Sequence, residues 1–168
     1  MDMAIPGHIG RWRSLAVEAL ERTTIVAKFL SMLHVTNTYI CTSILVFGPS
    51  MFPTLNPAGD VVLAEGLSPR LGKVTAGDVV VVRSSENPRR IITKRVVGME
   101  GDRVTFLADP AHHWSRTVVV PKGHVWIQGD NTYASNDSRH FGPIPYGLIK
   151  GKVFCRVWPL NGFGSLEQ

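Results

Sequence analysis

The sequence predicts a mainly β domain with an antiparallel, barrel-like sheet, preceded by a single N-terminal helix. Two observations support this fold class. Helix-forming sequence is confined to the region before Gly48. After Gly48, short runs of β-branched residues recur between turn residues, as expected for strands. Strands that are this short and closely spaced are typical of antiparallel, barrel-like domains.

The composition is that of a folded globular protein. The chain has 168 residues, of which 44% are hydrophobic and 18% charged, enough for one domain with a core. The formal net charge is +5, and a basic balance can indicate nucleic acid or an anionic membrane as partner. No run of lysine and arginine with interleaved aromatic residues occurs, so we expect no nucleic-acid binding. Cys41 and Cys155 lie too far apart in the sequence to suggest a disulfide framework.

The region before Gly48 divides into two predicted segments. Residues 1–22 form an amphipathic segment, in which RWRSLAVEALER is good helix-forming sequence. Residues 23–47 form a transmembrane helix, because they are largely apolar and long enough to cross a bilayer with some tilt. Arginines precede this second segment, so a spanning helix would keep the N-terminus on the positive-inside face of the membrane.

Polar residues weaken the transmembrane interpretation. Lys28, His34 and Asn37 interrupt the apolar run, and a charge at bilayer depth is costly. An amphipathic helix packed on the domain is therefore the alternative for this segment.

Residues 48–168 are predicted to form the β domain. Glycine, proline, asparagine and aspartate separate its apolar runs and indicate turns. The irregular stretch 129–147 is long for a structureless loop, and loops of that length are more often functional than decorative. The expected strands are 61–64, 79–83, 91–97, 104–107, 117–120, 125–128 and 151–158.

Ser50 is a candidate nucleophile. It lies in the stretch GPSMFPTL, whose glycine and prolines restrict the backbone and could present the serine hydroxyl in a fixed direction. A simple turn is the alternative, since serine beside glycine and proline is common. Met51 and Phe52 are expected to be packing residues rather than a lipid-contacting patch.

Lys94 is a candidate general base. Side chains alternate along a strand, so Lys94 shares a face with Ile92 and Val96. If that face is the core face, the ammonium loses its hydration and the lysine pKa falls. A neutral lysine amine can accept the proton of a serine nucleophile. A solvated strand edge is the alternative for this stretch on its own.

A polar loop, GDNTYASNDSRHFGP, is the third candidate element. Asp137 and Arg139 could pair and brace it, and a hydroxyl from it could orient a lysine amine. An ordinary polar loop is the alternative.

Together these stretches resemble the S26 family, the type I signal peptidases. GPSMFPTL is similar to the family's nucleophile box, AGDVVVV to its next strand, TKRVVGMEGD to its lysine box and GDNTYASNDSRHFGPIP to its C-terminal box. The match covers about residues 47–156. It implies that the β domain is a signal-peptidase catalytic domain with one N-terminal membrane-anchoring helix.

The resemblance also implies roles for individual residues. Ser50 and Lys94 would form a Ser-Lys dyad, Ser135 would orient the lysine, and Asp137 with Arg139 would form a structural ion pair. In some members a serine two residues before the nucleophile donates to the oxyanion. Here that position is glycine, so the oxyanion hole would rest on the Ser50 N–H and on a second donor that the sequence does not identify.

Within the family, the short chain and the direct passage from the lysine box to the final box are similar to the mitochondrial inner membrane proteases. That likeness implies a protein of the mitochondrial inner membrane, in contact with lipid, with its catalytic domain facing the intermembrane space. It implies a homologous second protease subunit as partner, in a heterodimer. The implied substrates are precursor proteins with N-terminal sorting signals.

Other chemistries fit the sequence less well. The histidines have no metal-ligand spacing and no CxxC occurs, so we expect neither a metal nor a cofactor. A Ser-His-Asp triad matches none of the four boxes. A non-catalytic assembly subunit with the same β domain is the main alternative, against which Ser50 and Lys94 argue. A self-cleaving repressor-type Ser-Lys protein would carry a DNA-binding helical domain, for which the N-terminal region leaves little room.

Overall fold

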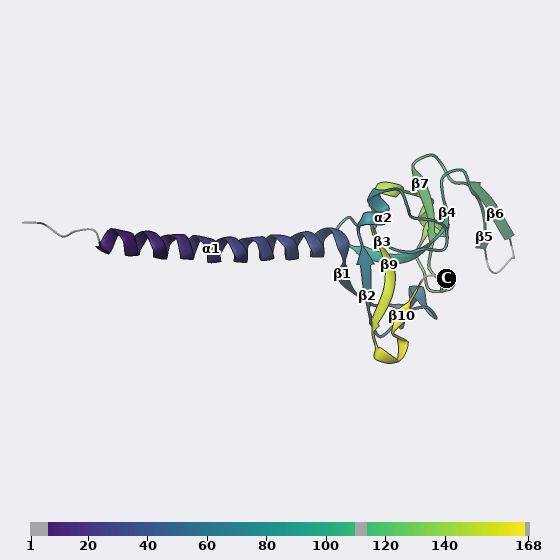
Figure 1. Ribbon diagram of the computed structural model, residues 1–168. Helices are drawn as coiled ribbons and strands as arrows, with labels where there is room; N and C mark the ends of the chain where they lie inside the picture. Colours follow the sequence, from purple (N-terminus) through teal and green to yellow (C-terminus); the bar gives the residue numbers. More distant parts are fainter. Residues whose placement is uncertain (1–6, 110–113, 167–168) are drawn as a thin grey trace, which may run out of the picture. The chain divides into compact units, whose positions relative to one another are not determined.

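The computed structural model describes residues 7–109 and 114–166 (Figure 1). The chain divides into two compact units, Met1–Thr38 and Tyr39–Gln168. Among the described residues, the first unit is helical and the second holds the strands, and the boundary between them lies at Thr38 rather than at residue 47.

One continuous helix, α1 (Gly7–Val35), makes up the described part of the N-terminal unit, and a π-helical turn, Thr36–Ile40, follows it. Glu18 and Arg22 form an ion pair of 2.6 Å one turn apart on its surface. The hydroxyls of Thr23 and Thr24 donate to backbone carbonyls four residues earlier, which satisfies them within the helix. No helix in the described ranges combines the length and the apolar character that crossing a bilayer requires.

The predicted bounds of the transmembrane helix, residues 23–47, are wrong. The helix begins far earlier and ends at Val35, and Thr42–Val46 forms strand β1 instead. Strand β1 pairs antiparallel with β2 over its whole length, from Thr42 opposite Ala64 to Val46 opposite Asp60. The stretch TSILV is apolar and β-branched, so it suits a strand as well as a membrane helix, and the available partner strand decides between them.

The β domain is an antiparallel sheet that curls into an open half-barrel (Figure 1). The ladders β2–β9, β3–β9 and β4–β7 each contain a register shift, and such bulges bend and twist strands. The mainly β, antiparallel class predicted from the sequence is therefore confirmed. In spatial order the strands are β1 (Thr42–Val46), β2 (Asp60–Glu65), β9 (Ile149–Trp158), β3 (Val79–Arg83), β4 (Ile91–Gly98), β7 (His124–Gln128) and β8 (Ile144–Pro145), with β10 (Gly164–Ser165) beside β9.

A separate two-stranded ribbon and several short helices complete the domain. The ribbon is β5 (Arg103–Asp109) with β6 (Trp114–Val119), and Phe106 packs its ring 4.9 Å from that of Trp126 on β7. The short helices are α2 (Leu67–Arg70), α3 (Ser138–Phe141) and the 3-10 turns Pro49–Met51, Tyr146–Leu148 and Leu160–Gly162.

Strand β3 lies at the centre of the sheet and is buried on both faces. Val80 and Val82 pack into one core cluster, while Val79 and Val81 pack into another. This double burial explains why β3 is a continuous valine run rather than an alternating one. The first cluster contains Val74, Val80, Val82, Val96, Val125, Ile127, Ile144 and Ile149, and the second contains Met51, Leu55, Val62, Ala64, Val79, Val81 and Val153.

All seven expected strands are present, with bounds that differ by a few residues. Strands β1, β8 and β10 were not expected. The stretch that forms β1 lies inside the predicted helix, and the other two contain only two residues each, too few for any periodicity to show.

Candidate active site

Ser50 lies in the 3-10 turn Pro49–Met51, which follows β1. Gly48 begins the turn with φ +104°, a conformation that other residues rarely adopt. Met51 and Leu55 are each 1% exposed and fix the turn in the core, so Met51 is the packing residue that the sequence predicts. Phe52 is half exposed instead. Ser50 itself is half-buried, so its neighbours hold the turn while its side chain stays accessible.

Lys94 lies on β4, opposite Val80 of β3, and is only 4% exposed. Of its neighbours on the same strand face, Val96 belongs to the first core cluster and the partly buried Ile92 packs against that cluster. The core-face position predicted by strand alternation is therefore confirmed, and the alternative of a solvated strand edge is wrong for this residue.

The surroundings of Lys94 favour its neutral form. Burial lowers its pKa from 10.5 to about 8, and the arginines Arg90 and Arg139 act in the same direction. The carboxylates of Asp137 and Asp130 oppose the shift without cancelling it. Among the described residues, none accepts a hydrogen bond from the Lys94 amine.

The Asp137 carboxylate organises the polar loop. It is fully buried, and it accepts hydrogen bonds from the Gly129 N–H at 2.8 Å, the Ser135 hydroxyl at 2.6 Å and the Arg139 guanidinium at 2.7 and 2.8 Å. Burial opposes its ionisation, but the bonds from Arg139, Gly129 and Ser135 outweigh that effect and hold the pKa of Asp137 below its ordinary value. The predicted Asp137–Arg139 ion pair is therefore present.

Backbone contacts bring this loop to the serine. The Asn131 N–H donates to the Ser50 carbonyl at 3.0 Å. A Cβ on Gly129 would collide with that same carbonyl and with the Ser135 hydroxyl, so only glycine allows this approach. Strand β4 also contacts the 3-10 turn of Ser50. The structure thus gathers the nucleophile box, the lysine box and the C-terminal box in one place.

Two expected contacts are absent from the described residues. No hydrogen bond joins the Ser50 hydroxyl to the Lys94 amine, and none joins Ser135 to Lys94. Ser135 donates its proton to Asp137 instead, which leaves its oxygen lone pairs free to accept. The role of Ser135 in orienting the lysine stays a prediction.

Sequence reasoning missed an ion pair beside the site. The Arg95 guanidinium binds both carboxylate oxygens of Asp130 at 2.9 Å, and the Thr54 hydroxyl donates to the same carboxylate. The signal was available, because Arg95 follows Lys94 and alternation places it on the opposite face, where a part-buried guanidinium needs an acid. The acid comes from a loop far away in sequence, and no local pattern identifies it.

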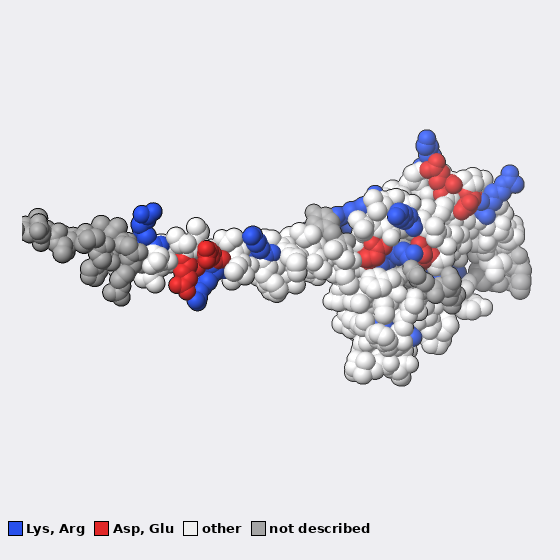
Figure 2. Space-filling model, viewed as in Figure 1, with Lys and Arg blue, Asp and Glu red and all other residues white. Residues whose placement is uncertain are grey.

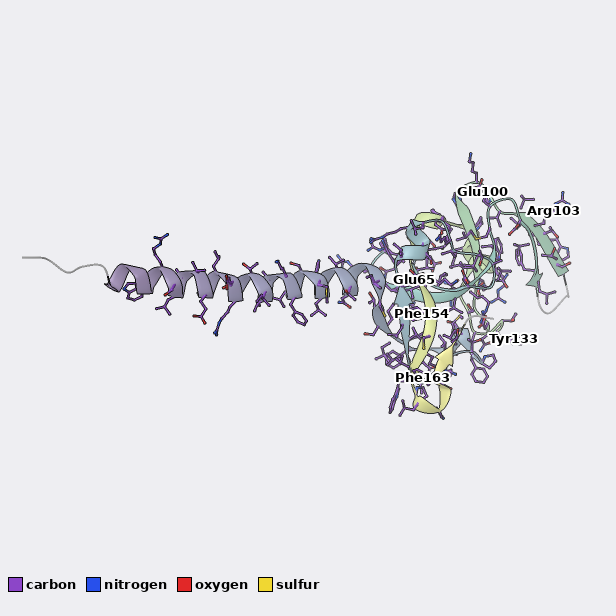
Figure 3. All side chains as sticks on the ribbon, viewed as in Figure 1. Glu65, Glu100, Arg103, Tyr133, Phe154 and Phe163 are labelled. Atoms are coloured by element: carbon purple, nitrogen blue, oxygen red, sulfur yellow. The ribbon has the colours of Figure 1, made fainter. Side chains whose placement is uncertain are left out.

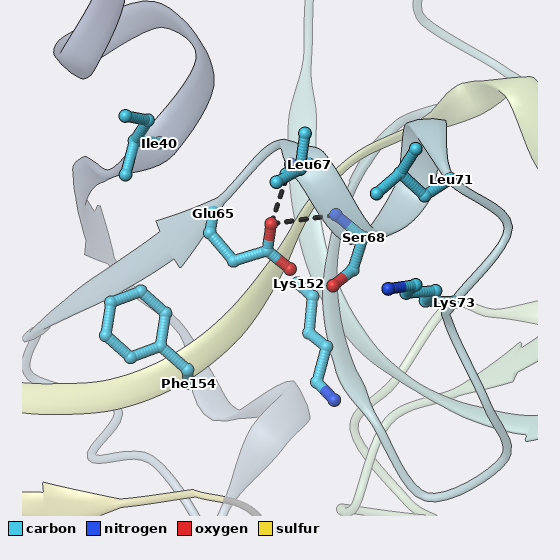
Figure 4. A pocket seen from close by; sticks show the side chains of 8 residues that line it. All are labelled: Ile40, Glu65, Leu67, Ser68, Leu71, Lys73, Lys152 and Phe154. Atoms are coloured by element: carbon cyan, nitrogen blue, oxygen red, sulfur yellow. Dashed lines mark hydrogen bonds between the residues drawn. The ribbon is translucent and has the colours of Figure 1, made fainter.

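The other features that could bind a ligand lie elsewhere. A cavity of about 400 Å³ opens beside α2 and contains none of the predicted site residues (Figure 4). Within the described ranges, no group of three or more histidine, cysteine or acidic side chains could hold a metal ion. The cavity is lined by Ile40, Glu65, Leu67, Ser68, Leu71, Lys73, Lys152 and Phe154.

Comparisons with known proteins identify the family. Residues 18–111 and 107–158 match the family described as signal peptidase, peptidase S26. The mitochondrial ATP-independent inner membrane protease subunit 1a of Arabidopsis thaliana is 60% identical, over 99% of this chain and 100% of its own length. The human mitochondrial inner membrane protease subunit 1 is 43% identical, over 80% of each chain. Subunit 2 of the zebrafish Danio rerio protease is 43% identical, over 73% of this chain and 67% of its own length.

Replacing Lys94 by methionine should stabilise the protein near neutral pH. The folded-state pKa lies below the unfolded value, so burying the charged lysine is unfavourable below about pH 8. A depression from 10.5 to about 8 corresponds to at most about 3 kcal/mol of unfolding free energy. Chemical denaturation of the full chain in mild detergent should show Lys94→Met more stable at pH 7, with the difference shrinking towards pH 10 as the wild-type amine becomes neutral.

The matched control is Lys150→Met, because Lys150 is exposed on β9. Its stability should follow wild type at both pH values. Equal stabilities of Lys94→Met and wild type at pH 7 would contradict the desolvation of Lys94.

Gly129→Ala should destabilise the domain by about 2 kcal/mol, because the added methyl group would overlap the Ser50 carbonyl and the Ser135 hydroxyl. Gly147→Ala is the control: a Cβ at Gly147 meets nothing within 4 Å. Thermal unfolding should therefore separate the two variants, and equal melting temperatures would show that the loop moves away from Ser50 without cost.

Proposed function

Because the chain belongs to the S26 family of signal peptidases, we propose that it is a membrane-bound serine endopeptidase that removes N-terminal sorting peptides, with Ser50 as nucleophile and Lys94 as general base. One observation carries this assignment. Lys94 is buried with a pKa lowered to about 8, on the strand that contacts the Ser50 turn.

The lowered pKa makes lysine usable as a base at neutral pH. With a pKa of about 8, roughly one Lys94 amine in ten is neutral at pH 7. A lysine with the ordinary value would be neutral in only about one molecule in three thousand. Burial therefore raises the reactive fraction by more than two orders of magnitude.

The proposed reaction has two steps. The neutral Lys94 amine takes the Ser50 proton while the Ser50 oxygen attacks the carbonyl carbon of the scissile bond. The Ser50 N–H donates to the oxyanion, and the Lys94 ammonium then gives its proton to the departing amine. This leaves an ester on Ser50. Neutral Lys94 then takes a proton from water as the water oxygen attacks the ester carbonyl carbon. The bond from that carbon to the Ser50 oxygen breaks, the Lys94 ammonium returns its proton to the Ser50 oxygen, and the sorting peptide leaves with a new C-terminal carboxyl group.

Ser135 is proposed to orient the Lys94 amine. Its proton is committed to the Asp137 carboxylate, so its oxygen acts as an acceptor towards a lysine N–H and does not occupy the lysine lone pair. That lone pair then remains available for the Ser50 proton. Arg139 keeps Asp137 ionised and in place, which makes the ion pair structural. The Ser50–Lys94 contact itself is expected to form when substrate binds, as catalytic hydrogen bonds often tighten only in the complex.

Location and partners are inferred from the relatives. They are named as subunits 1 and 2 of mitochondrial inner membrane proteases. We therefore infer that this chain works at that membrane with its β domain in the intermembrane space, beside a homologous second subunit, on precursors with N-terminal sorting signals. A non-catalytic assembly role is the outcome to expect if Ser50 proves dispensable.

Exposed apolar surfaces support contact with lipid. Helix α1 leaves large apolar side chains such as Phe29 and Met32 more than half exposed. In the β domain, Trp158, Leu160 and Phe163 are also more than half exposed, and the face shown in Figure 2 carries few charges around β10. Figure 3 labels Phe163, which directly precedes β10. Soluble surfaces rarely gather such residues without a partner.

Ser50→Ala should abolish cleavage of a precursor while the protein still folds. Removing the nucleophile of a serine protease commonly lowers turnover by several orders of magnitude. The assay uses the full chain with its second subunit, in detergent, on a mitochondrial precursor that carries a sorting signal. Lys94→Arg should be equally inactive, because a guanidinium stays protonated. Wild-type activity should rise with pH through an apparent pKa near 8, as the amine becomes neutral.

Ser165→Ala is the control for loss of a hydroxyl, since Ser165 is exposed on β10. Undiminished cleavage by folded Ser50→Ala would favour the non-catalytic assembly role. Substantial activity of Lys94→Arg would instead place the general base elsewhere.

Membrane attachment has its own test. Mitochondria that contain the full chain should keep it in the membrane pellet after alkaline carbonate extraction, because helix α1 offers apolar surface along its length. Added protease should reach the β domain only after the outer membrane is opened. Release of the chain into the carbonate supernatant would show that it is bound peripherally.

A further inference from the structure

Thr54 occupies a junction between three parts of the candidate site. It lies four residues after Ser50, three residues beyond the end of the 3-10 turn Pro49–Met51, and is half-buried. Its hydroxyl donates to the Asp130 carboxylate and lies 3.3 Å from an Arg95 nitrogen that donates to it. The nucleophile box, the lysine strand and the polar loop therefore meet at one side chain.

The loop holds the Ser50 turn at two points. At one end of the turn, the Asn131 N–H donates to the Ser50 carbonyl at 3.0 Å. At the other end, Asp130, the neighbour of Asn131, accepts the Thr54 hydroxyl proton. Core packing of Met51 and Leu55 holds the turn in the domain, and these two attachments set its orientation relative to the loop.

The lysine strand is connected to the same carboxylate. Arg95 directly follows Lys94 and binds Asp130 through two nitrogens, and it also donates to the Gly77 carbonyl at 2.8 Å. Hydrogen bonds from Arg95 and Thr54 outweigh burial and hold the pKa of Asp130 below its ordinary value, so it remains an acceptor. Asp130 thus relates the turn of the serine to the strand of the lysine.

The fold of the turn does not depend on the Thr54 hydroxyl. The Thr54 carbonyl accepts a hydrogen bond from Arg156 at 3.0 Å, and Arg156 also binds the buried Asp60 at 3.2 Å. Met51 and Leu55 anchor the turn in the core. A change limited to the side chain of Thr54 should therefore leave the turn folded and remove only its link to Asp130.

We propose that Thr54 is a positioning residue, whose hydroxyl, through Asp130 and Arg95, fixes the direction in which Ser50 faces Lys94. This inference rests on the proposed function, because it takes Ser50 and Lys94 as the reacting pair. The Thr54 hydroxyl is hydrogen-bonded to Asp130 and Arg95 rather than to the reacting pair, so it acts through the position of the turn. A small displacement of a nucleophile can lower turnover by as much as about a hundredfold.

The test compares Thr54→Val with Thr54→Ser. Valine keeps the shape of threonine and removes the hydroxyl, whereas serine keeps the hydroxyl and removes a methyl group. With precursor as substrate and the full chain in its complex, Thr54→Val should lower kcat at least about tenfold and leave KM within about twofold. Thr54→Ser, which keeps the hydroxyl, should have a kcat within about threefold of wild type. Turnover is expressed per folded protein, measured by circular dichroism.

A hydroxyl removed elsewhere provides the control. Thr105 and Thr117 share a hydrogen bond of 2.8 Å on the exposed β5–β6 ribbon, and Thr105→Val should leave kcat unchanged. The effects of Thr54→Val and Asp130→Asn should also be non-additive, because both break the same contact. If Thr54→Val does not fold, Asp130→Asn alone should still lower kcat with KM unchanged.

The outcomes separate the two proposals. If Ser50→Ala is inactive while Thr54→Val keeps wild-type kcat, the positioning role is wrong and the proposed function stands. If Thr54→Ser lowers kcat as much as Thr54→Val does, the role of the hydroxyl is also wrong. If Ser50→Ala cleaves as well as wild type, the proposed function itself fails.

Discussion

The buried Asp137 carboxylate is the interaction on which the arrangement of the site depends. A fully buried negative charge is unfavourable unless donors surround it, and here a guanidinium, a backbone N–H and a serine hydroxyl do so. Each donor is thereby fixed in turn: Arg139 in α3, Gly129 against the Ser50 carbonyl, and Ser135 with its lone pairs free. The loop organised in this way is attached to the Ser50 turn by the Asn131 N–H and the Asp130 carboxylate.

The same carboxylate limits how far the pKa of Lys94 can fall. Its charge raises the lysine pKa, and a direct ion pair would keep the amine protonated and useless as a base. Arg139 neutralises Asp137 at short range, so the carboxylate that organises the loop affects Lys94 only as a weaker opposing influence. Burial therefore remains the largest effect on Lys94, and the pKa settles at about 8 rather than near the ordinary lysine value.

The sequence predicts those parts of this arrangement that depend on local pattern. Alternation along 91–97 placed Lys94 on the face of Ile92 and Val96, and its burial shows that this face is the core face. Strand β1 could not be predicted in the same way, because TSILV is compatible with a membrane helix and only its pairing with β2 makes it a strand. The contacts of Asp130 with Arg95 and Thr54 join residues 35 or more positions apart, and single-sequence patterns carry no information about such distances.

Three aspartates stabilise the nucleophile turn and the polar loop, and each is paired with an arginine rather than a lysine. Asp60 binds Arg156, Asp130 binds Arg95 and Asp137 binds Arg139. A guanidinium stays charged at any pH where the protein is folded, and its planar set of donors can hold a carboxylate and a backbone carbonyl together, as Arg95 and Arg156 do. These ion pairs therefore stay charged over the pH range in which Lys94 loses its proton. A change of pH near 8 alters the proposed base without loosening the structure that positions it.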